Sequence, residues 1–212
     1  MGQVIKMEGK IKMKKNIKWI IFTILLVMFG IITYAVVSEK IGGFDSRIYD
    51  VVTKVTNPFL DNMHKVITFF GSVAGIIIFA IAVLIFMKDK KKAFWIVGGT
   101  ASATILNNIV KFAVKRERPL VRRLVEEHSY SFPSGHTMGA VGFYGMMIFF
   151  IWRSNLEKSK KIIYTALLTL LIIAIMVSRI YLGAHFASDV LAGAVLASAF
   201  LIIYTSFIKK NN

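Results

Sequence analysis

Cysteine is absent from the 212-residue chain, which excludes disulfide bonds, thiolate nucleophiles and cysteine-ligated metal sites. Acidic residues are also few, because 11 Asp and Glu stand against 27 Lys and Arg, and the formal net charge is +16. A charge of this size occurs in nucleic-acid-binding proteins, whose basic residues gather on one polar face. Here the basic residues alternate with long apolar stretches, so we expect no nucleic-acid partner.

The chain also has few long polar segments, such as those that form the surface of a soluble domain. Hydrophobic residues make up 56% of the chain, whereas soluble domains are about 45 to 50% apolar even with glycine included. A helix needs about 20 apolar residues to cross about 30 Å of hydrocarbon. Six such stretches occur, at about residues 19–37, 66–86, 94–114, 136–152, 162–180 and 187–208. We therefore predict an all-α, polytopic membrane protein in a lipid bilayer, with one integral-membrane domain over residues 1–212.

The first apolar stretch decides on which side of the membrane the chain starts. It follows the basic residues 1–18 and could be a secretory signal, but its 19 residues exceed the usual length and no clear cleavage site follows. With this stretch retained as a span, the side of the two termini carries 16 Lys and Arg and three acidic residues. The loops on the other side, residues 38–65 and 115–135, have four basic against four acidic and five against three. The positive-inside rule then predicts cytoplasmic termini and outer loops in a plasma-membrane protein.

The first outer loop has a helical pattern of apolar residues. The stripe consists of Phe44, Ile48, Val51, Val52, Val55 and Phe59. Asn57-Pro58 interrupts it near its end. We expect an amphipathic helix at the outer interface, which serves either as a lid for lipid access or as a simple cover for the bundle.

Basic residues cluster at the end of the third predicted span, in the segment 111–119. Lys111 and Arg118 are seven residues apart, which places them on one helical face about 10.5 Å apart along the axis. Both can reach one small anion from there, and Pro119 disfavours helix at Arg118 and can turn its guanidinium inward. The alternative is a basic helix end that reaches the lipid headgroups. Lys111 lies deeper than this alternative requires.

A second cluster precedes the fourth predicted span, in the sequence Pro-Ser-Gly-His at residues 133–136. Ser134 is a favourable helix-start residue, and Gly135 allows a close backbone approach. The free N–H groups and the positive dipole of a helix N-terminus favour a phosphate. His136 can give or take a proton near neutral pH at the same point. We expect an anion site here.

The third cluster lies in the segment 178–189, where Arg179, His185 and Asp189 occur among apolar residues. Such charges cost about 2.5 to 3.5 kcal/mol each at the centre of a bilayer, so partners or a ligand must be near. His185 and Asp189 are four residues apart, so the carboxylate can hold one imidazole nitrogen. The other nitrogen is then either a metal ligand or a nucleophile. Few further ligands and many cations accompany it, which favours an anionic substrate and predicts no metal and no cofactor.

Together, the three clusters resemble the signature of the type-2 phosphatidic acid phosphatase superfamily, in its bacterial membrane branch. The family pattern K-x6-R-P, P-S-G-H and S-R-x5-H-x3-D is matched at every position and spacing by residues 111–119, 133–136 and 178–189. The motifs cover about the last half of the chain. The resemblance implies a six-helix membrane enzyme that hydrolyses a lipid phosphate.

The resemblance also implies residue roles. His185 would attack phosphorus and form a phosphohistidine, with Asp189 orienting it, while His136 would protonate the leaving lipid oxygen and later activate water. The phosphoryl oxygens would be held by Lys111, Arg118, Ser134, Gly135 and Arg179. Phosphatidylglycerophosphate, phosphatidic acid and undecaprenyl diphosphate are the candidate substrates. A lipid phosphotransferase with the same site stays open, and a small ion transporter explains Arg179, His185 and Asp189 but neither of the other motifs.

Overall fold

The computed structural model describes the backbone of residues 2–209 and the side chains of residues 16–209. Within this part the protein is all-α and contains no strand. The elements are α1 (Gly2–Val37), α2 (Gly42–Val52), α3 (Pro58–Phe69), α4 (Val73–Phe86), α5 (Lys90–Val114), α6 (Gly135–Arg153), α7 (Lys158–Tyr181), α8 (Ala187–Tyr204) and the short 3-10 helix η1 (Thr205–Phe207).

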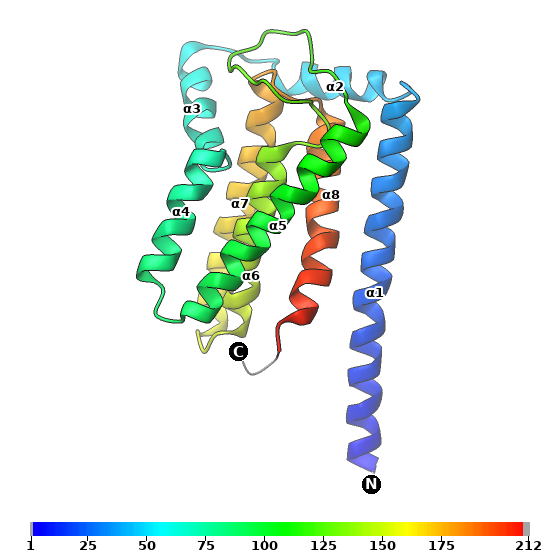
Figure 1. Ribbon diagram of the computed structural model, residues 1–212, viewed down its shortest axis with the longest axis vertical. Coiled ribbons are helices and arrows are strands. Elements are labelled where there is room, and N and C mark those ends of the chain that lie inside the picture. The colour runs from blue at the N-terminus through cyan, green and yellow to red at the C-terminus, as the bar shows by residue number, and fades with distance from the viewer. Residues whose placement is uncertain (1, 210–212) are drawn as a thin grey trace.

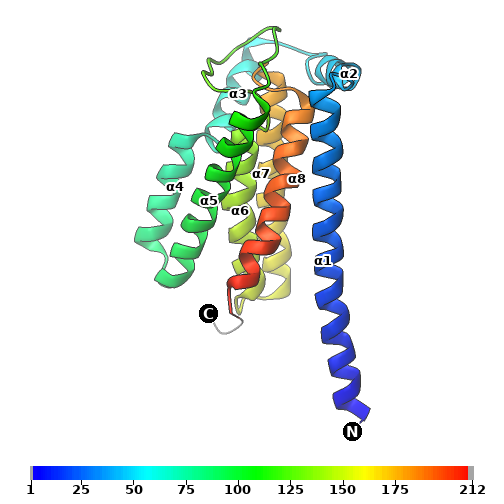
Figure 2. The ribbon, with the colours of Figure 1, turned by 45° about the vertical axis from the view of Figure 1, so that its right-hand side comes forward.

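The long helices run side by side in one bundle (Figure 1). Helix α6 lies inside the bundle and packs against α4, α5, α7 and α8. Its glycines permit this packing: a Cβ atom at Gly142 would lie 3.2 Å from the Ala103 side chain of α5, and one at Gly145 would lie 2.6 Å from Leu201 of α8. Helix α1 packs on the outside of α8 (Figure 2).

Four helical segments are long and apolar enough to cross a membrane: residues 16–37 of α1, α5, α7, and α8 together with η1. The pair α3 and α4 makes a fifth if its two helices form one span. The fourth predicted span, residues 136–152, corresponds to α6, which is not among the helices that are long and apolar enough by the same measure. Its glycines and His136 lower its hydropathy, and many of its side chains face neighbouring helices instead of lipid.

The second predicted span, residues 66–86, is wrong as one straight helix. The chain breaks between α3 and α4, whose axes are bent by 47°. Ser72 starts α4 as its N-cap and accepts a hydrogen bond from Gly75 N at 3.0 Å. At the break, a Cβ atom on Gly71 would lie 2.6 Å from the Ile175 side chain of α7 and 3.2 Å from the His136 carbonyl oxygen. The break therefore brings this segment against the start of α6.

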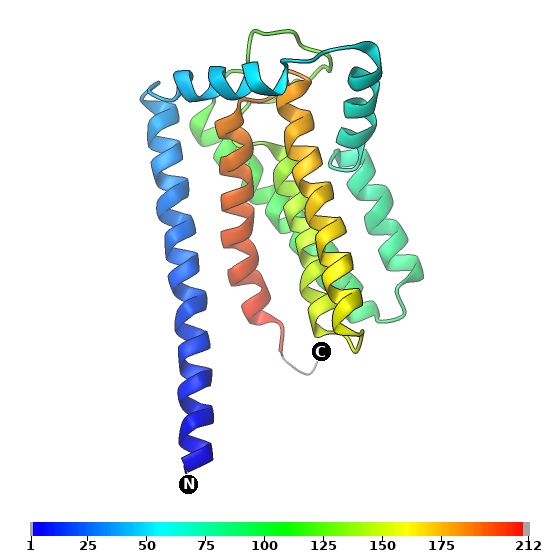
Figure 3. The ribbon, with the colours of Figure 1, turned by 180° about the vertical axis from the view of Figure 1, so that it is seen from behind.

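The predicted amphipathic helix over residues 44–59 is shorter than expected. Helix α2 ends at Val52, so Val55 and Phe59 are not part of it. The Asn57 side chain accepts from Leu60 N at 2.9 Å and caps the following helix, with Pro58 in its first turn. Helix α2 lies across one end of the bundle, over α8 (Figure 3). Its side chains Phe44 and Val51 are exposed.

The two ends of the bundle differ in what they carry. Helix α2, the loop between α5 and α6 and the connection between α7 and α8 lie at one end (Figure 1). Helix α1 begins and α8 ends at the other, where the short turns between α4 and α5 and between α6 and α7 also lie. All three motif clusters meet at the first of these ends.

Candidate active site

Helix α5 supplies Lys111 on its last turn and then stops. It ends at Val114, and Lys115 takes up a left-handed conformation with φ 53°. The prediction that Lys111 and Arg118 share one helical face is therefore wrong, because Arg118 lies in the following loop. Lys111 is buried, and its ammonium group donates to the carbonyl oxygens of Tyr130 and, at 3.5 Å, Ser131.

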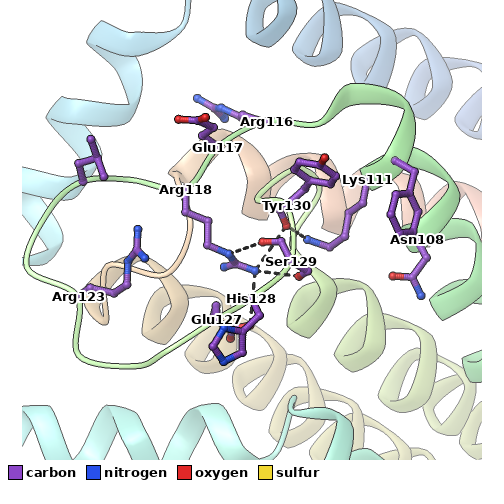
Figure 4. Close-up of a pocket in the computed structure, with 12 residues that line it drawn as sticks. Asn108, Lys111, Arg116, Glu117, Arg118, Arg123, Glu127, His128, Ser129 and Tyr130 are labelled. Atoms are coloured by element: carbon purple, nitrogen blue, oxygen red, sulfur yellow. Dashed lines mark hydrogen bonds and ion pairs between the residues drawn. The ribbon is translucent and has the colours of Figure 1, made fainter.

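Arg118 turns inward from this loop, as Pro119 suggested. Its Nε donates to Ser129 O at 2.7 Å (Figure 4). Its Nη1 donates to Ala184 O at 2.7 Å. Nη1 also lies 3.2 Å from His185 Nε2. Burial lowers the pKa of Arg118 from its usual value, while nearby Glu127 and Asp189 oppose that shift. The guanidinium thus stands directly beside the imidazole.

The loop that carries Arg118 is joined to the connection between α7 and α8. Leu124 N donates to Leu182 O at 3.0 Å. Gly183 has φ +67°, and a Cβ atom there would lie 2.4 Å from the Arg122 carbonyl oxygen. Glycine permits both this conformation and this approach. The contact holds the loop that carries Arg118 against the connection that carries His185.

The start of α6 forms the second wall of the site. Ser134 is the N-cap and is fully buried, and its hydroxyl oxygen accepts from Thr137 N at 3.4 Å. The backbone N–H of Ser134 donates to Asp189 O at 3.0 Å. This N–H is therefore occupied, contrary to the expectation that the N–H groups at the helix start are free to bind an anion. Asn107 of α5 donates to Pro133 O at 3.1 Å and holds the segment in place. The N–H groups of Gly135 and His136 remain as the first donors of the helix among the described residues.

His185 lies in the turn before α8 and is 2% exposed. The Arg118 guanidinium can only donate, so a neutral imidazole must accept at Nε2 and carry its proton on Nδ1. Burial lowers the pKa of His185 to about 4; Asp189 raises it again, and Arg179 and Arg118 lower it further. His185 is therefore neutral at pH 7, with its Nε2 lone pair directed at the cations.

Asp189 orients the other imidazole nitrogen less directly than the spacing suggested. His185 precedes α8, so the two residues do not share a helical face, and His185 Nδ1 lies 3.5 Å from Asp189 Oδ2. Ser131 lies beside both: its hydroxyl donates to Asp189 Oδ2 and lies 3.4 Å from His185 Nδ1. Phe186 N donates to Asp189 Oδ2 at 3.0 Å. The carboxylate, the hydroxyl and the imidazole form one fully buried group.

Arg179 reaches the site from the last turn of α7 and is 1% exposed. Its Nη1 donates to Thr68 Oγ1 of α3 at 2.7 Å, and its Nη2 donates to Glu127 Oε1. Its Nε is buried and has no partner among the described residues. Glu127 also lies 3.4 Å from Arg118 Nη2 and 3.9 Å from His136 Nδ1. A carboxylate thus occupies the space between the groups expected to hold a phosphate.

Two cavities meet at these residues. The first, of about 450 Å³, has an apolar part between α4 and α5, with Val73, Ile77, Ala80, Val97, Ala101 and Ile105 in its lining. Its polar end is lined by Lys111, Arg118, Glu127, Gly135, His136 and His185. The second cavity, of about 610 Å³, lies over the loop between α5 and α6 (Figure 4). Five residues border both cavities: Asn108, Lys111, Arg118, Glu127 and Ser129.

All eight residues expected at the site lie near one another. Lys111, Arg118, Gly135, His136 and His185 border the first cavity, whereas Ser134, Arg179 and Asp189 lie behind them in the protein. The sequence analysis missed Glu127 and Ser131, because neither residue is part of the three motifs and both are ordinary polar residues of the loop between α5 and α6. The described residues contain no group of three or more His, Asp or Glu side chains that could hold a metal ion.

The sequence profile of the PAP2 superfamily matches residues 92–212. The chain belongs to the PAP2 superfamily. All three motif clusters lie inside the matched segment, so the expectation from the spacing is confirmed at the level of the family.

Two similar proteins with assigned functions are phosphatases. The chain is 28% identical over 191 residues to phosphatidylglycerophosphatase B of Bacillus subtilis, with 88% of this chain and 94% of that protein covered. It is 24% identical over 196 residues to undecaprenyl-diphosphatase of Sulfolobus acidocaldarius, with 88% of each covered. These PAP2 relatives indicate that the protein is a membrane phosphatase.

Solved PAP2 structures have the same fold. The crystal structure of a transmembrane PAP2-type phosphatidylglycerolphosphate phosphatase from Bacillus subtilis matches with a TM-score of 0.79 and 26% identity, over 89% of this chain and 97% of that one. That of Aquifex aeolicus LpxE matches with a TM-score of 0.62 and 26% identity, over 76% and 93%. The bundle is therefore a transmembrane PAP2 fold.

Proposed function

We propose that the protein hydrolyses a phosphomonoester or diphosphate of a lipid through a phosphohistidine intermediate, without a metal ion or cofactor. The observation that carries this proposal is the position of His185 Nε2. It lies 3.2 Å from Arg118 Nη1, at the polar end of a cavity whose other part is apolar. A phosphate at that end meets the nucleophile and the cations together, while its lipid tail extends between α4 and α5.

The two steps follow from the positions of the two histidines. His185 Nε2 attacks phosphorus, the bond from phosphorus to the lipid oxygen breaks, and His136 gives that oxygen a proton. Water then attacks phosphorus with its proton passing to His136, and the bond to Nε2 breaks. The phosphate dianion itself favours the protonated form of His136 in the first step. The transition-state charge is stabilised by Lys111, Arg118, Arg179, the Ser134 hydroxyl and the Gly135 N–H.

The charges at the two ends of the bundle support a site at the outer face of the plasma membrane. The site lies at the end opposite to the start of α1, the turn between α4 and α5 and the turn between α6 and α7. Those segments carry most of the excess Lys and Arg. The positive-inside rule places them, and with them both termini, in the cytoplasm. The single domain over residues 1–212 then forms six crossings.

A panel of lipid phosphates tests the proposal. Purified protein in detergent with EDTA is given phosphatidylglycerophosphate, phosphatidic acid or undecaprenyl diphosphate, and released phosphate is measured. We expect hydrolysis of at least one of them, with the first and third favoured by the named relatives. Loss of activity with EDTA would contradict the metal-free reaction. Transfer of phosphate to an added alcohol in place of water would identify a phosphotransferase.

The pH profile follows from the position of His185. Because burial lowers the pKa of His185 to about 4, the neutral nucleophile persists as the pH falls from 7 to 5 and is lost only as the pH falls through about 4. We expect kcat/KM to follow this curve once the ionisation of the substrate phosphate, near pH 6, is taken into account. A remaining acid limb with a midpoint near the usual histidine value of about 6.5 would contradict this state of His185.

Glu127 is expected to compete with phosphate for the cations. In a Glu127→Gln variant the charge that pairs with Arg179 and Arg118 is gone, so inorganic phosphate should inhibit hydrolysis at about tenfold lower concentration, equivalent to about 1.4 kcal/mol. Inhibition curves with inorganic phosphate measure this. Glu126→Gln is the matched control, because Glu126 is exposed and forms no ion pair with another side chain among residues 16–209. Weaker inhibition of the Glu127 variant would mean that the carboxylate assists binding.

A further inference from the structure

A chain of charged and polar groups leads from α2 to Asp189. Asp45 of α2 is 3% exposed, and its Oδ2 accepts from Arg116 Nη2 at 2.8 Å. Arg116 Nη1 donates to Asp189 Oδ1 at 2.6 Å and to Ser188 Oγ at 2.7 Å. Asp45 also accepts from Ser188 N and Ser188 Oγ, both at 2.8 Å. One guanidinium thus bridges two carboxylates that are 71 and 73 residues away in sequence.

The two oxygens of Asp189 have different partners. Oδ2 faces Ser131 and His185, whereas Oδ1 is bound by Arg116. A buried carboxylate needs such pairing, because isolated charges are costly away from water. Arg116 also stacks on the Phe186 ring, with 4.0 Å from its guanidinium carbon to the ring centroid. Its fork is therefore held on three sides, and Asp189 has one orientation toward the imidazole.

We propose that Arg116 is a positioning residue for the nucleophile, and that α2 serves catalysis by holding Arg116 through Asp45. This inference rests on the proposed function of His185 and Asp189. It assigns a task to α2 that neither a lid nor a simple cover describes. Arg116 lies two residues before Arg118 and points to the other side of the loop (Figure 4). One loop thus directs one arginine to Nε2 of the imidazole and another to the carboxylate on its Nδ1 side.

An Arg116→Gln variant tests this role by steady-state kinetics. We expect kcat to fall by about tenfold, while KM stays within twofold. Removal of a residue that orients a functional side chain through a hydrogen bond costs about 10- to 100-fold in metal sites, and we take the lower end of that range here. Arg116→Lys should recover part of the loss, since lysine keeps the charge but lacks the fork that spans two carboxylates. Asp45→Asn should lower kcat in the same direction and add little in the Arg116→Gln background.

Arg122→Gln is the matched control. Arg122 comes from the same loop and pairs with Asp61 of α3 at 2.6 Å, but it makes no contact with Asp189. This variant should keep the wild-type kcat. If Arg122→Gln lowered kcat as much as Arg116→Gln, a general loss of loop order would explain both results. The positioning role of Arg116 would then be overturned.

A second measurement does not depend on turnover. The chain has only four histidines, so selective nitrogen-15 labelling of histidine can report the tautomer of His185 by NMR. We expect one tautomer, protonated at Nδ1, in the wild type and in Arg122→Gln, and a mixture in Arg116→Gln. Wild-type kcat and wild-type His185 signals in Arg116→Gln would overturn the positioning role of Arg116 and leave the proposed function standing. A wild-type protein with ordered His185 signals that hydrolyses no lipid phosphate would instead count against the proposed function.

Discussion

A His185→Ala variant is expected to lose hydrolysis of lipid phosphates, with kcat/KM lower by about 10⁴-fold or more. The reason is that Nε2 is the only proposed nucleophile at the polar end of the cavity, and alanine leaves no atom to form the bond to phosphorus. The variant should also form no covalent phosphoenzyme. Labelled substrate and an alkaline quench, which preserves phosphohistidine, measure this directly.

The control for this variant is His64→Ala. His64 stacks on Tyr181, with ring centroids 4.1 Å apart, and borders neither of the two cavities that meet at the site. Thermal unfolding in detergent verifies that both variants fold. Label trapped on the His185 variant, or full activity of that variant, would assign the nucleophile to another residue.

The second large effect is expected for His136→Ala, and it depends on the leaving group. A lipid alkoxide needs a proton as it leaves, so hydrolysis of a lipid phosphate should fall by about 10²- to 10⁴-fold, the usual contribution of a general acid. Nitrophenolate needs no proton, so a nitrophenyl phosphate ester should still phosphorylate His185. Release of the phosphate from His185 should remain slow, because His136 also activates the water.

This combination predicts a burst. With nitrophenyl phosphate, the His136→Ala variant should release about one nitrophenolate per active site and then turn over slowly, whereas a lipid phosphate should give no burst. Stopped-flow absorbance follows the first reaction. Equal losses with both substrates would show that His136 positions the phosphate and does not transfer protons.

The sequence allowed a correct prediction of the elements that depend on local pattern. Apolar runs of about 20 residues predicted the positions of α1, α5, α7 and α8, and motif spacing led to the family. The break between α3 and α4 was missed, because residues 66–86 are mostly apolar and the Ser72 N-cap at the break lies inside one apolar run, next to Gly71 with its contacts to α7 and His136. The end of α2 at Val52 was missed for a related reason, since the apolar stripe continues past it.

In the site, too, some features follow from the local sequence pattern and others depend on tertiary contacts. Motif residues come together as their spacing suggested, but the groups between them depend on tertiary structure. Arg116 is one of several basic residues in the segment 111–119, and only the approach of α2 and α8 gives it two carboxylate partners. Ser131 and Glu127 are common residues in a polar loop. Their roles follow from the fold of residues 115–134 over His185, which no local pattern encodes.

The shared border of the two cavities has a consequence for how the products separate. A lipid alcohol prefers hydrocarbon and can leave between α4 and α5, whereas inorganic phosphate prefers water and can leave through the polar cavity over the loop between α5 and α6. Each product then equilibrates with its own reservoir. Inhibition by phosphate would depend on the phosphate concentration in water. Inhibition by the lipid product would depend on its mole fraction in the membrane. The two products could be released in either order.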